Sequence, residues 1–399
     1  MGGDGADVAQ SGGNGGVTMR IDLSEMVGTE VLALLTKAGH QAYVVGGPVR
    51  NALLGVDVSD LDVATDARPE RVMALAKTAG LKAVPTGIDH GTVTVVIAGI
   101  GVEVTTFRRD VATDGRRAVV AFSDNIEDDA RRRDFTINAL YADANGDVLD
   151  PLGGLADLRA RRVRFIDDAS QRIREDYLRI LRFFRFFAWY GDQAEGLDPD
   201  GLAACAELAD GIEVLSKERI GAEMLKLLGA PDPVQAVAAM AQSGVLMRVL
   251  PGASVGVLAV LVQLEAEHNV APDPLRRLAA LGGVEIGKLF RLSKKQIIGL
   301  HTMRCELKST RFAHHLGYLY GLKRARDIIF LRAAAFEQPV CQEDLVKVAL
   351  GASSKFPLRA ADLPHLKGPV LGKALKAAEG EWIASEFTLP KDALIAKSR

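Results

Sequence analysis

The sequence has 399 residues, too many for one compact core, so two or more domains are expected. Its 48% hydrophobic and 25% charged residues are typical of an ordinary globular protein. The three scattered cysteines exclude a disulfide framework or a zinc knuckle and predict a cytoplasmic location, and the longest apolar run is too short to cross a bilayer. We expect no membrane and no obligate protein partner.

The predicted elements separate the chain into two parts. The Gly-rich residues 1–20 predict a disordered tail and lack the apolar segment of a signal peptide. Helical spacing over residues 23–38 and 69–79 alternates with short β-type runs at 42–45, 61–64, 92–98 and 102–107, which indicates a small α/β region. From about residue 170, Leu/Ala/Arg-rich helices continue, with breaks at Pro231, Pro251, Pro272 and Pro357. The sequence therefore predicts an α+β fold, a mixed head followed by an all-helical body.

A glycine pair stands at the first predicted strand-to-helix junction. Gly46 and Gly47 end the strand, and the helix that begins near Pro48 carries Arg50. Glycines there allow backbone N–H groups to approach a phosphate, and Arg50 could neutralise its charge. The pair alone is explained equally well by a tight turn.

Three acidic residues follow on neighbouring strands. Asp60 and Asp62 are two residues apart, so on a strand both carboxylates point to the same face, where they repel each other unless a cation is bound. Oxygen ligands of this kind suit Mg²⁺. Glu103 lies mid-strand between apolar positions. The three acids predict a two-metal phosphoryl-transfer site, with a polar loop as the alternative for the aspartates.

The net charge of −2 hides a basic block. Between Arg276 and Arg332 there are 13 Lys and Arg residues and three acids, a segment charge of +10. Such a block suits an RNA phosphate backbone, although a solvated helix face explains the charge equally well. The candidate RNA-binding residues are Lys294, Lys295, Arg324 and Arg326.

Six further motifs follow the glycine turn and the DLD sequence at 60–62, in a fixed order. They are HGTV at 90–93, EVTTFR at 103–108, RRDFTINAL at 132–140, DPLGGLADL at 150–158, EDYLRILRFFRF at 175–186 and SKERIGAEMLKLL at 216–228. The series resembles the polymerase β-type nucleotidyltransferases, in particular the class that contains bacterial CCA-adding tRNA nucleotidyltransferases and poly(A) polymerases. It covers about half of the chain. The resemblance implies a tail at 1–20, a nucleotidyltransferase head at 21–160, a helical neck at 161–230, and a tRNA-binding helical body and tail at 231–399.

The resemblance assigns roles to the motif residues. In RRDFTINAL it implies that Arg133 contacts phosphate and that Asp134 accepts a hydrogen bond from the ribose 2′-hydroxyl, although Asp134 could also cap a helix. The polar segment between Arg108 and Asp134 matches the position of the family's flexible loop, which takes part in the switch from C to A addition. Arg219 and Glu223 match the last motif, which braces the template helix.

The motif EDYLRILRFFR is implied to read the incoming base. Asp176, Arg179, Arg182 and Arg185 are spaced by three and should line one side of a helix. Asp176 would accept from an exocyclic amine and Arg179 would donate to a ring nitrogen, a pattern that cytosine and adenine satisfy and uracil and guanine do not. Arg182 and Arg185 would lie toward phosphate.

The resemblance implies template-independent addition of C and A to the 3′ end of tRNA, with CTP and ATP as substrates, Mg²⁺ as cofactor and pyrophosphate as product. The alternatives are a bacterial poly(A) polymerase, an A-adding-only enzyme, and a catalytically silent tRNA-binding protein on the same scaffold. Intact Asp60, Asp62, Glu103, Asp176 and Arg179 argue against the silent protein.

Overall fold

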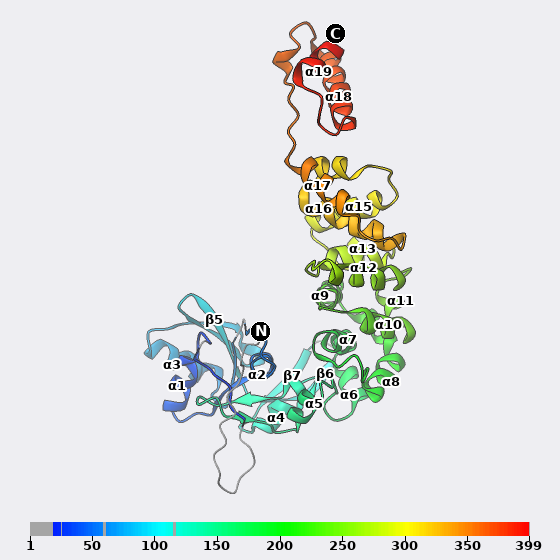
Figure 1. Cartoon of the computed structure of the whole chain (residues 1–399). Coiled ribbons are helices and arrows are strands. Elements are labelled where there is room, and N and C mark those ends of the chain that lie inside the picture. Colours follow the sequence, from blue (N-terminus) through cyan, green and yellow to red (C-terminus); the bar gives the residue numbers. More distant parts are fainter. Residues whose placement is uncertain (1–18, 25, 59–60, 115–116, 399) are drawn as a thin grey trace. The chain divides into compact units, whose positions relative to one another are not determined.

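The computed structural model describes residues 19–24, 26–58, 61–114 and 117–398 (Figure 1). The chain divides into two compact units. The first extends to Leu215 and includes Ser243–Val245, and the second comprises Ser216–Gln242 and the chain from Leu246 onward. Most of the expected tail lies outside the described residues, and the domain limits expected from the sequence stay predictions.

A seven-stranded mixed sheet forms the centre of the first unit, in the order β3-β4-β5-β2-β1-β8-β9. β2 and β5 pair in parallel, and the other neighbouring strands are antiparallel. The strands are β1 (Ala42–Val45), β2 (Asp62–Thr65), β3 (Lys82–Gly87), β4 (Thr92–Ile97), β5 (Ile100–Thr106), β8 (Tyr141–Ala142) and β9 (Val148–Leu149). The mixed sheet expected for the head is confirmed.

Helices α1 (Glu30–Lys37) and α3 (Pro69–Thr78) pack on this sheet, as Figure 1 shows. Val102 and Val104 of β5 are buried, whereas Glu103 between them is exposed, so Glu103 points to the opposite face from these valines. The helix expected over residues 23–38 begins at Glu30, because Gly28 has a φ of 102° that a helix cannot contain.

The polar segment after Arg108 contains regular structure. β6 (Arg108–Asp114) and β7 (Arg117–Phe122) form a separate antiparallel two-stranded sheet, followed by α4 (Ile126–Arg131). Phe122 and Ala121 pair with Arg108 and Arg109, so the ladder begins next to β5. The segment matched to the family's flexible loop therefore contains a hairpin and a helix among its described residues, and its part in the switch from C to A addition stays a prediction.

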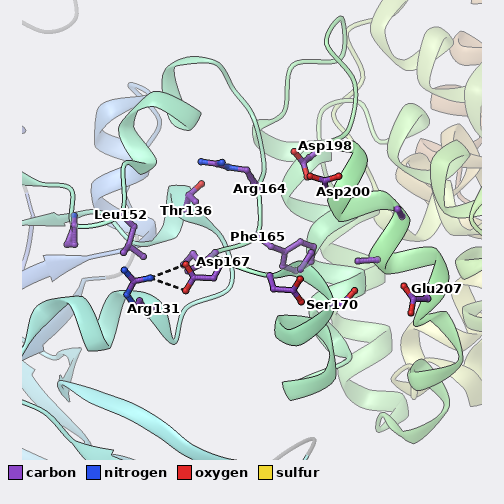
Figure 2. Close-up of a pocket in the computed structure, with 16 residues that line it drawn as sticks. Arg131, Thr136, Leu152, Arg164, Phe165, Asp167, Ser170, Asp198, Asp200 and Glu207 are labelled. Carbon is purple, nitrogen blue, oxygen red and sulfur yellow. Dashed lines mark hydrogen bonds and ion pairs between the residues drawn. The ribbon is translucent and has the colours of Figure 1, made fainter.

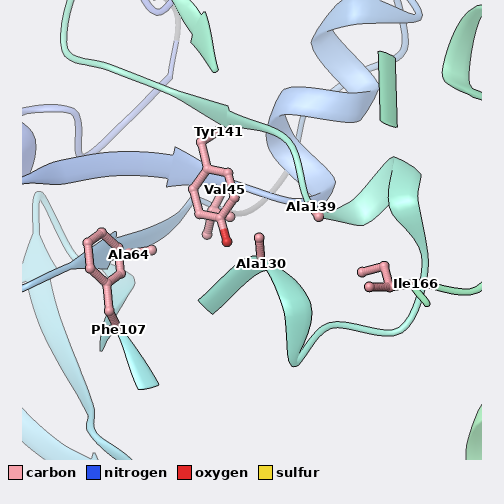
Figure 3. Close-up of a cluster of buried hydrophobic side chains, with 7 residues drawn as sticks. All are labelled: Val45, Ala64, Phe107, Ala130, Ala139, Tyr141 and Ile166. Atoms are coloured by element: carbon pink, nitrogen blue, oxygen red, sulfur yellow. The ribbon is translucent and has the colours of Figure 1, made fainter. Parts of the chain in front are cut away.

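The remaining helices of the first unit are joined to the sheet through buried apolar side chains. Figure 3 shows one cluster, in which Tyr141 of β8 and Ala130 of α4 pack with Val45, Ala64 and Phe107. An aromatic group continues it, because the Phe135 ring lies 4.9 Å from that of Phe165 and 5.1 Å from that of Phe186. The further helices of the first unit include α2 (Gly47–Leu53), η2 (Thr136–Asn138), α5 (Gly154–Arg159), α6 (Ala169–Glu175), α7 (Leu178–Tyr190), α8 (Pro199–Glu207) and η3 (Ala209–Val214).

From α9 onward the chain is helical. The helices are α9 (Lys217–Leu228), α10 (Val234–Gln242), α11 (Val245–Val249), α12 (Gly256–Glu267), α13 (Pro274–Leu281), α14 (Ile286–Leu289), α15 (Lys294–Leu307), α16 (Ala313–Ala335), α17 (Gln342–Ser353), α18 (Gly368–Ala384) and α19 (Lys391–Lys397). The four predicted proline breaks fall between helices, as expected. Gly351 of α17 lies against the backbone carbonyl of His314 in α16, so a side chain at this position would separate the two helices.

None of the helices in the described part of the chain combines the length and the apolar character needed to cross a membrane.

Candidate functional site

The glycine turn between β1 and α2 is built as the sequence predicts. Gly46 has a φ of 74° and a ψ of −116°, a backbone conformation that favours glycine. Its N–H donates to the carbonyl of Leu140 at 2.9 Å, and a Cβ added to it would lie 3.3 Å from Nη1 of Arg133. The turn therefore lies directly beside the guanidinium that the sequence assigns to phosphate.

Arg50 lies one helical turn after this junction and is only 6% exposed. Its guanidinium donates to Asn138, to Asn51 at 2.9 Å and to the hydroxyl of Tyr190 at 2.8 Å, and it lies 4.0 Å from the Tyr190 ring centre. Burial lowers the pKa of Arg50, and the Tyr190 hydroxyl opposes this effect. Arg50 thus joins α2 to η2 and α7, and its contact with phosphate stays a prediction.

Two of the three predicted acidic residues occupy paired positions. Asp62 opens β2 and Glu103 lies on β5, and these strands pair in parallel with Asp62 opposite Glu103. Side chains at paired positions of adjacent strands share a face of the sheet. Both residues are exposed, so neither carboxylate is buried among the apolar positions that flank it. Asp60 lies outside the described residues.

The donor chemistry of this pair suits magnesium. Carboxylate oxygens are the ligands that Mg²⁺ prefers, and it commonly completes its shell with water and substrate phosphates. Within the part of the chain that the structure describes, no group of three or more His, Cys, Asp or Glu side chains is placed to hold a metal ion. The described residues therefore supply two of the three predicted carboxylates, and the remaining one is Asp60.

Arg133 and Asp134 follow α4 and are held by different partners. Arg133 donates through Nη2 to the Asp129 carboxylate at 2.9 Å and through Nε to the Tyr141 hydroxyl at 3.2 Å. Asp134 accepts from the N–H of Phe135 at 2.9 Å and from Arg182 at 2.6 Å. The 3₁₀ turn η2 that follows begins after Phe135 and has no side-chain cap, so Asp134 does not cap a helix here.

Asp134 is a buried carboxylate whose pKa is low. Burial alone would raise its pKa, but the ion pair with Arg182 and the hydrogen bond from Asn138 lower the pKa to about 2. Its two oxygens already accept from three groups besides the Phe135 amide, two of them on Arg182. A ribose hydroxyl at Asp134 would therefore share the carboxylate with Arg182, and the ribose contact stays a prediction.

The proposed base-reading pair lies at the start of α7. Asp176 is extended, with a φ of −155°, and accepts from the N–H of Leu178 at 3.1 Å, so it precedes the helix instead of lying on it as the spacing predicted. Arg179 donates to Glu175 at 2.6 Å, to the Arg172 carbonyl at 2.8 Å and to the Arg132 carbonyl at 3.0 Å. These bonds use three of its five N–H groups.

The two following arginines lie on the same helix. Arg182 pairs with Asp134, and the Arg185 guanidinium lies 4.3 Å from the centre of the Phe186 ring. Leu178, Leu181 and Phe184 are buried on the other side, as the spacing predicts. Glu223 is buried and lies on α9 with Arg219, and their bracing of the template helix stays a prediction.

A cavity of about 780 Å³ lies elsewhere in the first unit, between α6, α8 and the segment before them. Figure 2 shows Arg131 paired with Asp167 in its wall, and Asp198 near Asp200. Its lining contains none of the predicted nucleotide-binding residues. The geometry around Gly46 and Arg133 has the residues for nucleotide chemistry, so the cavity is distinct from the candidate site.

The basic block of the second unit is partly neutralised by ion pairs. Arg276 and Arg277 are buried on Glu265, at 2.7 and 2.8 Å. Arg324 lies 3.3 Å from Asp327 and is partly buried. Lys294, Lys295 and Arg326 are exposed and have no acidic partner among the described residues. Of the four candidate RNA-binding residues, these three stay available to phosphate, whereas Arg324 belongs to an internal ion pair.

Sequence patterns did not reveal the residues that hold the side chains of the candidate nucleotide site in place. Asn138 joins Arg50 to Asp134, and Glu175 holds Arg179. Asn138 and Glu175 both belong to the recognised motifs, which marks them as candidate site residues. The motifs do not indicate their partners, because Asn138 and Arg50 are 88 positions apart in the sequence. Asp129 and Tyr141 lie outside any motif quoted above, and local spacing gives no sign of their contact.

Two family models match the chain. Residues 42–164 match the poly A polymerase head domain, and residues 196–255 match the probable RNA and SrmB-binding site of polymerase A. The first covers the sheet, the glycine turn and the two carboxylates, and the second covers α8 to α11.

Several proteins are similar over longer stretches. The chain is 36% identical to the mitochondrial CCA tRNA nucleotidyltransferase 1 of Danio rerio, over 91% of this chain and 88% of that protein. It is 42% identical to the human protein of the same name over 196 residues, 49% of this chain and 45% of that one. The matched stretch thus spans about half the length of the human relative.

Solved structures agree with these matches. The crystal structure of the Bacillus stearothermophilus CCA-adding enzyme in complex with CTP has a TM-score of 0.70 and 28% identity, over 93% of this chain and 95% of that one. The Thermotoga maritima CCA-adding enzyme complexed with tRNA has a TM-score of 0.67 and 18% identity, over 93% of both chains, which shows a shared fold. The chain therefore belongs to the CCA-adding tRNA nucleotidyltransferase family.

Proposed function

We propose that the protein adds C and A nucleotides to the 3′ end of tRNA from CTP and ATP and releases pyrophosphate. The observation that carries this proposal is the 3.0 Å hydrogen bond from Arg179 to the carbonyl of Arg132. It places the arginine proposed to read the base beside the residue preceding Arg133, which is proposed to bind phosphate. A site that selects the nucleotide without a template strand needs these two groups in one pocket.

The chemistry is a displacement at the α-phosphate. The tRNA 3′-oxygen forms a bond to the α-phosphorus and loses its proton, while the bond from the α-phosphorus to the pyrophosphate oxygen breaks. Magnesium ions bound by Asp60 and Asp62 would supply charge stabilisation for the attacking and leaving oxygens. Glu103, opposite Asp62, would help to ligate the metal or accept the proton.

The protein groups around the turn would hold the triphosphate. Gly46 and Gly47 have no side chains to keep a phosphate from their backbone N–H groups, and Arg133 lies against Gly46. Arg50 fixes α2 behind the turn through Tyr190. The positive groups are in place before the nucleotide binds, so little reorganisation is needed when charge develops on the leaving group.

Nucleotide selection is proposed to follow from donors and acceptors. The Asp176 carboxylate would accept from the exocyclic amine of cytosine or adenine, and the remaining N–H groups of Arg179 would donate to the adjacent ring nitrogen. Uracil and guanine present a carbonyl and a ring N–H, which would leave buried polar groups unpaired. The site should therefore use CTP and ATP and reject UTP and GTP.

The proposed tRNA-binding surface lies on the second unit. Lys294 and Lys295 open α15, and Arg326 lies on α16. Exposed cations of this kind bind duplex RNA mainly through its phosphates and its shape. We propose a cytoplasmic location. The relatives of the chain include a bacterial enzyme and a protein that is named as mitochondrial.

Single-step labelling tests the proposal. A tRNA lacking CCA should accept C from CTP alone, and a tRNA ending in CC should accept one A from ATP alone. Both reactions should require a divalent metal. Long runs of A on either substrate would indicate a poly(A) polymerase, A addition without C addition would indicate an A-adding enzyme, and binding of tRNA without labelling would indicate a silent protein.

A further inference from the structure

A buried carboxylate outside the proposed catalytic groups lies at the base of the nucleotide site. Asp129, near the end of α4, is 0% exposed. One oxygen accepts from Arg132 through Nε at 2.7 Å and Nη2 at 2.6 Å. The other accepts from the Tyr141 hydroxyl at 2.8 Å and from Arg133 Nη2 at 2.9 Å. Both oxygens are therefore fully used by the protein itself.

This carboxylate remains charged although it is buried. Burial raises the pKa of Asp129, but the charges of Arg133 and Arg132 and the hydrogen bonds from Arg133 and Tyr141 lower it to about 2. An uncompensated buried charge would be strongly destabilising, so the position requires both arginines. If either arginine changed its side-chain conformation, the buried Asp129 carboxylate would lose hydrogen bonds and part of its compensating charge.

The contacts fix which part of Arg133 faces the glycine turn. Nε and Nη2 are directed to Asp129 and Tyr141, whereas Nη1 lies 3.3 Å from the position of a Cβ at Gly46. An arginine fork has a rigid plane, so two anchored nitrogens determine where the third points. The guanidinium is thus preset toward the place proposed for the triphosphate.

The second arginine on Asp129 leads to the base-reading residue. The side chain of Arg132 is held by Asp129, and its backbone carbonyl accepts from Arg179 Nη2 at 3.0 Å. Anchoring the side chains of two consecutive residues on one carboxylate restricts the backbone between them. That backbone is one of the three anchors of Arg179.

We propose that Asp129 is a positioning residue for nucleotide binding, which presets Arg133 toward the triphosphate and the Arg132 carbonyl toward Arg179. This inference rests on the proposed function, because it assigns phosphate and base to those two arginines. Tyr141 assists by donating to the same oxygen that Arg133 uses. One buried anion thereby links phosphate binding to base selection.

The test measures CTP, ATP and UTP affinity without tRNA for Asp129→Asn, Tyr141→Phe and the parent. Displacement of a positioning group by about 1 Å can cost up to about a hundredfold, so Asp129→Asn should weaken CTP and ATP binding about tenfold or more and reduce the preference for CTP over UTP. Tyr141→Phe, which keeps the ring in the core, should have a smaller effect in the same direction. Unchanged affinities and preference in a folded Asp129→Asn protein would overturn the proposal.

Glu265→Gln is the matched control. Glu265 is also a buried carboxylate that accepts from the Nε groups of two consecutive arginines, Arg276 and Arg277, but it lies in the second unit. The Glu265→Gln variant should lower stability and leave CTP affinity within about twofold of the parent, because Arg276 and Arg277 have no role in the nucleotide site. An equal loss of CTP affinity in both variants would reduce Asp129 to a general structural residue.

A double-mutant cycle separates positioning from stability. If Asp129 acts through Arg133, Asp129→Asn should cost less CTP affinity in an Arg133→Ala background than alone, whereas additive losses would contradict the proposal. If Asp129→Asn is poorly folded, the same cycle with Tyr141→Phe decides. Failure of the proposed function appears separately, as CTP binding by the parent without extension of tRNA.

Discussion

The exposed cations of the second unit lead to a quantitative prediction about tRNA affinity. Lys294, Lys295 and Arg326 have no acidic partner among the described residues, and each is on the surface. Changing all three to Gln should weaken tRNA binding. Arg324, a fourth candidate from the sequence, is left unchanged because it pairs with the buried Asp327, so its removal would disturb the fold.

The magnitude follows from counterion release. Each phosphate contact contributes roughly 0.7 to 0.9 to the slope of log affinity against log salt concentration, so three lost contacts should reduce the slope by about 2 to 3. The assay is tRNA affinity by filter binding or fluorescence anisotropy across about 50 to 200 mM salt. CTP affinity should stay unchanged, because the nucleotide site is built in the first unit.

A matched control removes the same charge from exposed cations that already have an acidic partner. They are Lys288, Arg291 and Lys323, which lie 3.0, 3.3 and 2.8 Å from a carboxylate oxygen. Their neutralisation to Gln should change the salt slope less. Equal slopes for the two triple variants, or a slope equal to that of the parent, would show that the unpaired cations do not contact tRNA.

Three further predictions concern the first unit. Asp62→Ala and Asp60→Ala should each reduce kcat for C addition by at least about a hundredfold without a matching loss of tRNA affinity, because metal ligands act on the transition state; activity within a few-fold of the parent would reject the metal assignment. Asp176→Ala and Arg179→Ala should lower the ratio of CTP to UTP incorporation measured under competition, and an unchanged ratio in both would remove them from the template role. Burial raises the pKa of Asp134, but the ion pair with Arg182 lowers it to about 2. The charged carboxylate therefore stabilises the folded protein above the ordinary pKa near 4, and this stabilisation is lost as the pH falls toward 2. Melting curves of Asp134→Asn should therefore show a weaker pH dependence between about pH 4 and pH 2 than those of the parent, and an equal dependence would contradict the ion-pair account.

Local patterns predicted the strands that carry the site. β1 matches the predicted run at 42–45, and β4 and β5 match to within two residues because their apolar and polar positions alternate clearly. β3 was missed because Lys82–Gly87 contains a proline and polar residues, and β8 and β9 have only two residues each. The β6–β7 hairpin was not predicted, because the segment was identified only by its match to the position of the family's flexible loop.

The site was predicted where the signal is local. The glycine turn follows from the two glycines at the end of a strand, whereas the register that places Asp62 opposite Glu103 was not predicted. The contacts of Arg50 with Tyr190 and of Asp134 with Arg182 join residues 140 and 48 positions apart, and neither spacing nor composition specifies such pairs.

The basic block shows even more clearly that local sequence patterns do not specify which side chains pair. Its charge is evident from the sequence, but which cations are neutralised depends on how α12, α13, α15 and α16 pack. Arg276 and Arg277 look like ligands for RNA in the sequence, whereas the fold buries both on Glu265. A charge count therefore predicts a basic surface without identifying its residues.

Sequencing the 3′ ends of a tRNA that lacks CCA, after incubation with the protein, a divalent metal and all four nucleoside triphosphates, tests the central claim most directly. We predict that most extended molecules end in CCA and stop there, and that Asp62→Ala produces no extension under the same conditions. Ends extended by U or G as readily as by C and A, or by a homopolymer of A, would contradict the proposal.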